Sequence, residues 1–285
     1  MIDQTSLVLV RTALAEDLAG YGDITSRWTV PAALRGRAVI DAREDMVVCG
    51  LPLAAAVMKE IDPGAVFRPL VEDGMPVSSG DQVATIGGAA RSILSAERTM
   101  LNFLIHLSGV ATQSRRFARA VEGTGATVVD TRKTIPGMRA WEKRAVLYGG
   151  CANHRFGLFD MVLIKNNHLE AAGGVRAAID RVRAAHPHYV KVEVEVENEA
   201  DLREAIDCGA DVIMLDNQGV DSLRQLVQVA RGIRPDVVLE ASGRVSLANV
   251  AEVGRTGVDL ISSSTLTMAA PPVDLGLTLA VGQHV

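Results

Sequence analysis

The stretch YVKVEVEVENEADLREAIDCGADVIMLDN, residues 189–217, carries one complete unit of the fold. It begins with valines alternating with charged residues, ends in an apolar run closed by an aspartate, and has a helical pattern in between. Asn198 is placed as the N-cap of that helix, and Gly209 as the left-handed residue that follows it. Ser246 is placed in the same way as the N-cap of a later helix. The stretch therefore predicts a strand, a helix and a second strand.

The same alternation extends from about residue 110 to residue 269. Six short apolar runs end abruptly in polar residues, and helical patterns follow them. The predicted strands lie in ATVVDTRK (126–133), DMVLIKNN (160–167), YVKVEVEVEN (189–198), DVIMLDN (211–217), DVVLEASG (236–243) and VDLISSS (258–264). This number of units favours a barrel over an open sheet, and no Gly-x-Gly-x-x-Gly follows a strand to indicate a dinucleotide fold. We expect an α/β barrel over residues 110–269.

The first hundred residues have a different pattern. Residues 1–18 are helical, and the segments after them are short strands broken by glycine and proline. We therefore expect residues 1–109 to form a separate small α/β domain, to which the tail 270–285 returns. A long helix with Ser95 as its N-cap should connect this domain to the next one.

The polar residues are concentrated between residues 130 and 168. The whole chain is acidic, with 34 Asp and Glu against 29 Lys and Arg and a net charge of -5, so a basic cluster is not general solubilising charge. The cluster lacks the interleaved aromatic residues of a nucleic-acid surface, and we expect no nucleic-acid partner. Its members are Asp130-Thr131-Arg132-Lys133-Thr134, Arg139, Lys143, Arg144, Asn153-His154-Arg155 and Lys165-Asn166-Asn167-His168. The cluster predicts a pocket for a small polyanion.

Length and composition restrict the class of protein. With 285 residues, 48% of them hydrophobic, the chain can bury a large core. No stretch approaches the roughly 18 apolar residues of a membrane span, and charges come too early for a secretory signal, so we expect a cytoplasmic protein. Cys49, Cys151 and Cys208 are odd in number and far apart, which argues against disulfides and a zinc ribbon. We interpret all three as reduced packing residues, with Cys151, inside the basic cluster, as the one that remains a candidate nucleophile.

Arg132 and Lys133 directly follow a predicted strand, where barrel enzymes build their sites. An isolated Arg-Lys pair is more often solvated charge at the start of a loop, but the further cations nearby favour an anion site. Arginine binds carboxylates and phosphates in a bidentate way, and lysine supplies a compact charge, so the mixture suits a ligand with both groups. His154, next to Arg155, is interpreted as a donor in the same pocket.

Lys165 ends the apolar strand MVLIK and should emerge at the same rim. Two roles compete for it: a deprotonated amine that forms a Schiff base, as in an aldolase, or a protonated amine that binds phosphate. We favour binding of phosphate or pyrophosphate.

The strand KVEVEVEN places Glu193, Glu195 and Glu197 on one face. An edge strand with a solvated face has the same pattern, and for this segment alone that interpretation is favoured. Asp216, however, ends the next strand, so its carboxylate should lie near one of the glutamates. Paired carboxylates facing a basic pocket could hold a hydrated Mg²⁺ or stabilise positive charge that develops on a sugar.

Small residues follow the last two strands. Ser242, Gly243, Ser263 and Ser264 can offer hydroxyl and backbone N–H groups to a terminal phosphate. Ordinary turn chemistry explains them equally well from the residues alone.

Taken together, these motifs resemble the quinolinate phosphoribosyltransferases, the decarboxylating enzymes of NAD biosynthesis. The resemblance covers almost the whole chain and rests on four segments: SAERTMLNFLIHLSG, DTRKTIPGMRAWEKRAVLYGGCANHRFGLFDMVLIKNNH, VEVEVENEADLREAIDCGADVIMLDN and LEASG. It implies an N-terminal α/β sandwich-like domain, an irregular seven-stranded α/β barrel, and a homodimer whose subunits complete each other's sites.

The resemblance also implies roles for single residues. The substrates would be quinolinate and phosphoribosyl pyrophosphate, with Mg²⁺ and no organic cofactor. Glu195 and Asp216 match the family's phosphoribosyl and Mg²⁺ carboxylates, and Lys133 matches its central lysine. The quinolinate-binding cations match Arg132, His154, Arg155 and Lys165, with Thr131 beside them and Arg98 reaching in from the neighbouring subunit.

The chain departs from the family pattern in the phosphate region. Ser263-Ser264-Thr265 replaces a Val-Gly-Ala type of turn, and Arg244 replaces a small or polar residue after Ser242-Gly243. The lost glycine could tighten the phosphate site, while the added hydroxyls and Arg244 could serve as donors. The ending resembles relatives associated with molybdenum transport genes, so a paralogous enzyme for another heteroaromatic acid is the alternative. A Schiff-base aldolase using Lys165 and a non-catalytic sensor of phosphoribosyl pyrophosphate are the other hypotheses.

Overall fold

The computed structural model describes residues 2–185 and 188–281 and divides the chain into two compact units. The first unit comprises residues 1–115, 140–149 and 270–285, and the second comprises residues 116–139 and 150–269. Within the described ranges, no helix combines the length and hydropathy that a membrane crossing requires.

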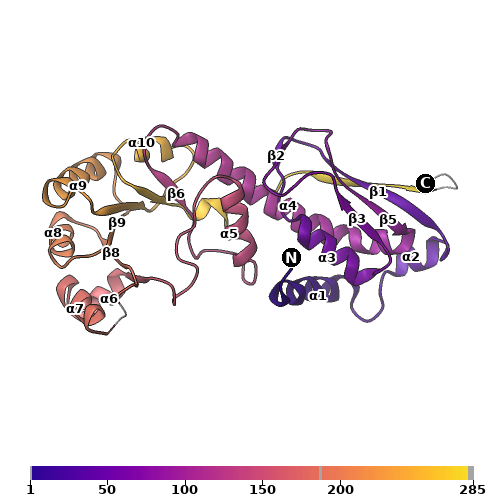
Figure 1. The fold of residues 1–285 in the computed structure, drawn as a ribbon, viewed down its shortest axis with the longest axis horizontal. Helices are drawn as coiled ribbons and strands as arrows, with labels where there is room; N and C mark the ends of the chain where they lie inside the picture. Colours follow the sequence, from indigo (N-terminus) through magenta and orange to yellow (C-terminus); the bar gives the residue numbers. More distant parts are fainter. Residues whose placement is uncertain (1, 186–187, 282–285) are drawn as a thin grey trace. The chain divides into compact units, whose positions relative to one another are not determined.

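The first unit is built on an antiparallel sheet with strand order β12-β1-β5-β3 (Figure 1). Its fully buried side chains include Ile40, Leu53, Ile86 and Leu104, which come from both strands and helices and form one core. The elements are α1 (Gln4–Leu18), α2 (Ile24–Thr29), β1 (Arg35–Ala42), β2 (Met46–Val47), α3 (Leu51–Ile61), β3 (Val66–Pro69), β4 (Pro76–Val77), β5 (Gln82–Ala89), α4 (Ala90–Ala120), α5 (Arg139–Tyr148) and β12 (Leu275–Val281). The last residues of α4, from Arg116 onward, belong to the second unit. The C-terminal strand β12 pairs with β1, so residues distant in sequence share one sheet.

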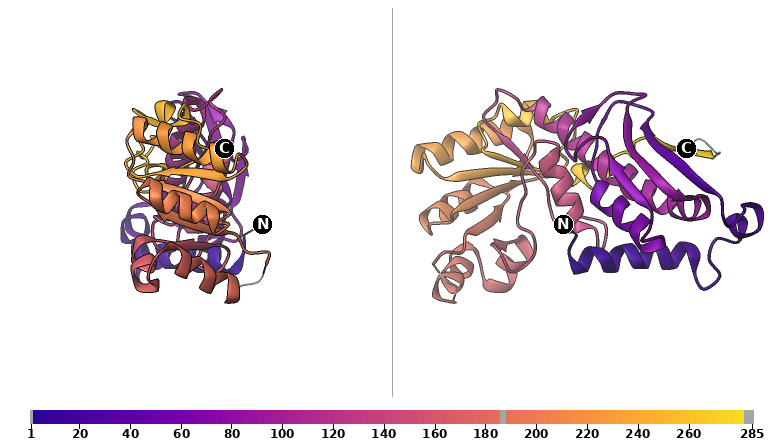
Figure 2. Two further views of the ribbon diagram at one scale, coloured as in Figure 1. Left: turned by 90° about the vertical axis from the view of Figure 1, so that its left-hand side faces the viewer. Right: turned by 45° about the vertical axis from the view of Figure 1, so that its right-hand side comes forward.

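The second unit contains the six strands predicted from the apolar runs, all parallel, in the order β6-β11-β10-β9-β8-β7. Its helices pack side by side on the outside of the strands, as the right-hand view of Figure 2 shows. The elements are β6 (Thr127–Val129), β7 (Val162–Ile164), α6 (Asn166–Ala172), α7 (Val175–Ala185), β8 (Val192–Val196), α8 (Glu199–Asp207), β9 (Val212–Asp216), α9 (Val220–Ile233), β10 (Val238–Ser242), α10 (Val250–Gly254), β11 (Leu260–Ser262) and the 3-10 turn η1 (Ser264–Leu266).

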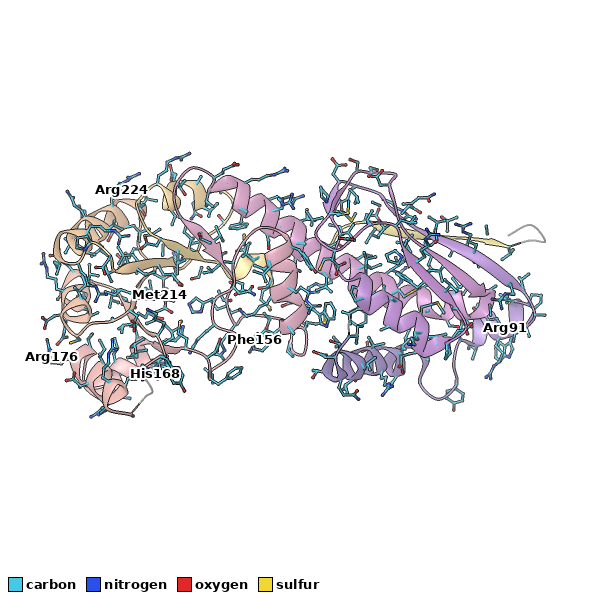
Figure 3. The ribbon with its side chains drawn as sticks, in the orientation of Figure 1. Arg91, Phe156, His168, Arg176, Met214 and Arg224 are labelled. Atoms are coloured by element: carbon cyan, nitrogen blue, oxygen red, sulfur yellow. The ribbon has the colours of Figure 1, made fainter. Side chains whose placement is uncertain are left out.

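The predicted helix pattern of this unit is confirmed where it could be read locally. Asn198 caps α8 by accepting the Asp201 N–H, and Gly209 follows that helix with φ of 75°. The apolar stripe of α9, from Leu223 to Ala230, is buried, whereas Arg224 is exposed on the same helix (Figure 3).

Among the described residues, six strands form the parallel sheet rather than the expected seven, and the seventh position is a single bridge between Val129 and Ala152. The reason lies in Asp130. Its Oδ1 atom accepts the His154 N–H at 2.8 Å, so the donor that would extend the ladder bonds a side chain instead. The chain turns away after one bridge, and this turn brings His154 to the interior.

Two predicted helix caps are wrong. Ser95 lies inside α4, which begins at Ala90, and its hydroxyl donates to the Arg91 carbonyl. The Ser246 carbonyl accepts the N–H groups of Asn249 and Val250 in a turn. Helix α10 begins only at Val250, with Asn249 as its N-cap. Helix α4 therefore begins earlier than Ser95 predicts, and α10 begins later than Ser246 predicts. One residue type is a weak guide to where a helix begins, because tertiary packing overrides local preference.

Candidate functional site

The candidate residues of the second unit gather where the parallel strands end. Lys165 follows β7, Glu195 is the next-to-last residue of β8, Asp216 ends β9 and Ser242 ends β10. Parallel strands point their carboxyl ends the same way, so four separate segments deliver polar groups to one rim.

Two adjoining cavities occupy this rim. The first, of about 320 Å³, is lined by Thr131, Arg132, Lys133, His154, Arg155, Leu163, Lys165, Met214, Glu240, Ser242 and Ser262. The second, of about 420 Å³, is lined by Thr131, Lys133, Lys165, Glu195, Asp216, Asn217, Ser242, Gly243, Arg244, Val245, Ser262, Ser263, Ser264 and Thr265. Lys133 and Lys165 belong to both linings, so these two cations stand at the junction of the cavities.

The first cavity has a cationic wall. Arg155 is half-buried, and its pKa is lowered by burial and then by the charge of Arg132, while its Nη1 atom donates to the Met161 carbonyl at 3.1 Å. The Nε atom of Arg132 is buried and has no hydrogen-bond partner among the described residues. An orphaned guanidinium nitrogen beside a cavity is suited to an anionic ligand.

Several cations of the basic cluster serve the structure rather than the cavities. Arg139 donates to Thr134 Oγ1 and to the Arg132 carbonyl, which braces the loop after β6. Lys143 is buried on α5 in the first unit, and the guanidinium of Arg144 lies 4.5 Å from the Trp141 ring. The expectation that every basic residue of the cluster joins one pocket is therefore too broad.

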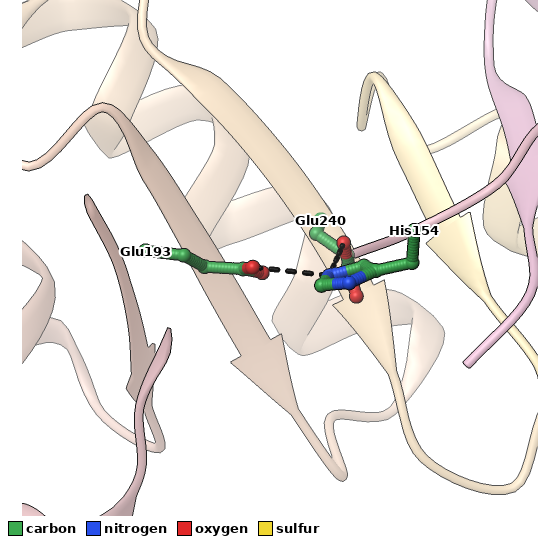
Figure 4. Close-up of side chains that lie close together, drawn as sticks. All are labelled: His154, Glu193 and Glu240. Carbon is green, nitrogen blue, oxygen red and sulfur yellow. Dashed lines mark hydrogen bonds and ion pairs between the residues drawn. The ribbon is translucent and has the colours of Figure 1, made fainter. Parts of the chain in front are cut away.

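Two glutamates lie beside His154 (Figure 4), and since His154 and Glu240 line the first cavity, we call Glu193 and Glu240 its acidic floor. His154 Nε2 lies 3.0 Å from Glu193 Oε2 and 3.4 Å from Glu240 Oε2, and both glutamates are completely buried. Burial alone lowers the pKa of His154, but the hydrogen bonds and charges of Glu193 and Glu240 outweigh it and raise this pKa to about 10. Burial and the charge of Glu240 raise the pKa of Glu193.

The burial of β8, the strand that carries Glu193, contradicts one interpretation of the sequence. Strand β8 is buried along its whole length with neighbours on both sides, so the solvated edge strand favoured for KVEVEVEN is wrong. Glu240 was not identified from the sequence. The sequence does contain a signal for it, because a single glutamate inside the apolar run VVLEAS is unusual for an ordinary buried strand. Met214, which Figure 3 places among the strands, was missed as a lining residue for lack of any polar signal.

The second cavity holds the acidic pair expected at the strand ends. Lys165 Nζ lies 3.4 Å from Glu195 Oε2, and Asp216 Oδ2 accepts from Asn217 Nδ2 at 2.6 Å. Two carboxylates from neighbouring strands in an open polar cavity fit Mg²⁺, which prefers oxygen ligands and takes few of them from protein.

The turn after β11 uses its hydroxyls internally. Ser263 Oγ donates to the Val245 carbonyl at 2.9 Å and accepts the Thr265 N–H at 3.2 Å, and Thr265 Oγ1 donates to the same carbonyl at 3.1 Å. These two hydroxyls brace the turn and are not available as extra phosphate donors, which corrects that expectation. Other donors on this wall include backbone N–H groups, the Ser242 and Ser264 hydroxyls and exposed Arg244.

Gly243 is required in this turn. Its φ is 97°, and a Cβ atom there would lie 2.5 Å from Asn217 Oδ1 and 2.9 Å from Asn217 Cα. Asn217 and Arg244 also adopt positive φ, so the main chain bends sharply around the second cavity.

Arg98 differs from the other candidates. It is exposed on α4 in the first unit and is not among the described residues that line the two cavities.

Cys151 lacks the properties of a nucleophile. It is buried, and burial, with a smaller contribution from the charge of Asp130, raises its pKa to about 12. We expect iodoacetamide at neutral pH to modify Cys208, which is partly exposed, before Cys151 in the native protein, as read by mass spectrometry. Denatured protein, in which all three cysteines react, is the control, and rapid modification of native Cys151 would contradict the expectation.

Comparisons with known proteins agree with this architecture. Residues 23–108 match the N-terminal domain and residues 110–278 the C-terminal domain of quinolinate phosphoribosyl transferase. The nicotinate-nucleotide pyrophosphorylase [carboxylating] of Mycobacterium leprae is 44% identical over 273 residues, covering 95% of both chains. A probable enzyme of that name from Synechocystis sp. is 40% identical over 266 residues, covering 93% of this chain and 90% of the relative.

Solved structures give the same result. The nicotinate-nucleotide pyrophosphorylase from Francisella tularensis superposes with a TM-score of 0.92 at 38% identity and covers 98% of both chains. A match over both domains, combined with identity well above 30% along nearly the whole length, shows common descent and a common fold. The chain belongs to the quinolinate phosphoribosyltransferase family.

Proposed function

We propose that this protein transfers the phosphoribosyl group of phosphoribosyl pyrophosphate to quinolinate and releases CO₂, giving nicotinate mononucleotide and pyrophosphate. The observation that supports this most strongly is the pair of adjoining cavities with shared lysines. One cavity is cationic and suits a pyridine dicarboxylate. The other combines carboxylates, a glycine turn and backbone donors, which suits a phosphorylated sugar.

The acceptor is assigned to the first cavity. Arg132 and Arg155 bind its two carboxylates, with Thr131 and His154 completing the wall, so that the pyridine nitrogen faces the second cavity. Binding both reactants in adjoining cavities holds the nitrogen next to C1 of the ribose, so that a bimolecular step becomes effectively unimolecular.

The phosphoribosyl group is assigned to the second cavity. As the bond from C1 to pyrophosphate breaks, the carboxylates of Glu195 and Asp216 stabilise the positive charge that develops on the ribose. Lys133 and Lys165 offset the charge of the departing pyrophosphate, and Ser242, Gly243, Arg244 and the 263–265 turn bind the 5′-phosphate. Glu195 and Asp216 would also hold a Mg²⁺ ion, which supplies further positive charge for the pyrophosphate when bound.

Decarboxylation follows from the same arrangement without an organic cofactor. After the nitrogen is ribosylated it carries a positive charge. The electron pair left at C2 when the neighbouring carboxylate departs as CO₂ is stabilised by that charge, and a proton then takes the place of the carboxylate.

Domain roles, assembly and location complete the proposal. We assign catalysis to the barrel domain expected over residues 110–269, of which residues 110–115 and 140–149 group with the first unit, and residues 1–109 with the tail 270–285 to the N-terminal domain. The working form is a homodimer in which Arg98 of each chain completes the partner's acceptor site. A cytoplasmic location agrees with three cysteines that form no disulfide.

The test is release of labelled CO₂ from quinolinate carboxyl-labelled at C2, in the presence of phosphoribosyl pyrophosphate and Mg²⁺. Turnover supports the transferase. Binding of phosphoribosyl pyrophosphate without turnover would indicate a sensor, and borohydride trapping of a carbonyl substrate on Lys165 would indicate an aldolase. Turnover with another heteroaromatic acid and none with quinolinate would indicate the molybdenum-associated type of paralogue.

Nicotinate tests the acceptor assignment, because it has only one of the two carboxylates of quinolinate. One cation of the first cavity then stays unpaired, which costs about 2–3 kcal/mol, and we expect nicotinate to bind roughly 30- to 150-fold more weakly than quinolinate. Competition by each acid against labelled quinolinate measures the ratio. Equal affinities would show that the cavity does not recognise both carboxylates.

A further inference from the structure

Both ring nitrogens and the backbone N–H of His154 have polar neighbours. Its Nε2 atom faces Glu193 and Glu240, at 3.0 Å and 3.4 Å. Its Nδ1 atom lies 2.7 Å from the backbone N–H of Arg155, which donates to it. Its own backbone N–H donates to Asp130 at 2.8 Å. Three buried acids therefore determine where one histidine lies.

The contact with Arg155 identifies the tautomer. A ring nitrogen that accepts an N–H must have a lone pair, so the ring proton lies on Nε2 and points at the two glutamates. The carboxylates attract a second proton to the ring, but that proton would have to lie on Nδ1, against the Arg155 N–H. Two N–H groups at 2.7 Å would repel each other, so this contact opposes the protonation that the raised pKa of His154 favours, and we assign a neutral ring on the geometry of the contact.

This tautomer also argues against a metal ion on the cluster, although His154, Glu193 and Glu240 bring their ligand atoms within 4.8 Å of one another. A metal would need the lone pair of Nε2, and the ring would then carry its proton on Nδ1, where the Arg155 N–H already donates. The hydrogen bonds instead suit a chain that runs from the glutamates through the ring to the main chain.

We propose that Glu193 and Glu240 are positioning residues of the acceptor subsite, which act through the His154 ring to hold the main chain at Arg155. The Arg155 guanidinium lines the first cavity, and its Nη1 atom is tied to Met161. Displacement of the main chain at Arg155 would move this cation relative to Arg132, and a diacid needs both at fixed separation. The inference rests on the proposed function, because it names the residues that make its acceptor site rigid.

Two substitutions at each glutamate test the inference. Glu193→Leu removes the acceptor of the ring N–H, and Glu240→Leu removes the second carboxylate, which lies 3.4 Å from Nε2. Glu193→Gln and Glu240→Gln keep a polar oxygen and the same side-chain shape. We expect the leucine variants to raise KM for quinolinate roughly tenfold or more, with KM for phosphoribosyl pyrophosphate within about twofold, because a small displacement of a binding group costs this much. The glutamine variants should recover most of the affinity. Glu252→Gln, on the exposed face of α10, is the matched control.

A spectroscopic measurement keeps the test decisive if a leucine variant fails to fold. Nitrogen-15 NMR of the labelled wild-type protein, with His154 assigned by its loss in His154→Gln, should show protonated Nε2 and unprotonated Nδ1. A proton on Nδ1, an unchanged KM for quinolinate, or an equal rise of both KM values would each overturn the inference. Lack of any turnover by the wild type would instead reject the proposed function, while the NMR result would still report on the tautomer.

Discussion

Lys165→Met is expected to lower kcat by roughly 10²- to 10³-fold, since the loss of one preorganised charge at a developing transition state has an effect of this size. Methionine keeps most of the apolar length of lysine and removes only its charge. Lys165 is the N-cap of α6, and its backbone N–H donates to His168 Nδ1 at 2.9 Å. Its ammonium group lies beside Glu195. The main chain thus places the amine at the junction of the two cavities.

The large effect is expected on the reaction and not on stability. The side chain of Lys165 is half exposed, and an ion pair with that exposure adds little to folding. Lys191→Met is the control, because Lys191 is an exposed lysine of the same unit that also pairs with a carboxylate, at 3.3 Å from Asp211. Steady-state kinetics with thermal melting distinguishes the two effects. Activity of Lys165→Met within about threefold of the wild type would remove Lys165 from the proposed chemistry.

The strands and most helices of the second unit are predictable from the sequence because their signals are local. Each apolar run is short and ends in a polar residue, and the helices between them carry their stripe at a regular spacing. Since consecutive parallel strands end at one rim, the positions of Lys165, Glu195 and Asp216 follow from the strand ends alone.

The floor of the first cavity could not be predicted in the same way. The bond between His154 and Glu193 joins residues 39 positions apart, and Glu240 comes from another strand again. Pairing of this kind depends on which strands become neighbours and on the chain turning inward after Ala152, where the Asp130 side chain ends the ladder. A pattern in one segment contains no information about either event.

The hydroxyls of the last turn show a related difficulty. Residue types indicated donors at Ser263 and Thr265, but both hydroxyls are directed at the Val245 carbonyl. Serine and threonine bond to nearby backbone groups as readily as to a ligand, and only the three-dimensional arrangement decides between these outcomes.

Subunit mixing is expected to give the second large effect, because the proposed dimer draws each acceptor site from two chains. Arg98→Ala and Arg132→Ala should each abolish detectable turnover alone, since each removes a cation that binds a quinolinate carboxylate. When the two variants are denatured, mixed in equal amounts and refolded, half of the dimers contain one chain of each kind. Each mixed dimer has one site with neither substitution, so activity should return to about a quarter of the wild-type value.

The control is a mixture of Arg98→Ala with the double variant Arg98→Ala, Arg132→Ala, in which no combination of chains makes an intact site. Tags of different charge allow the mixed dimer to be isolated, and its activity per site can then be measured directly. Arg98 is exposed on α4, and the buried Nε atom of Arg132 has no hydrogen-bond partner among the described residues, so we expect both alanine variants to fold. If isolated mixed dimers stay inactive while each variant chain is folded, the two arginines do not act across subunits and the site belongs to one chain.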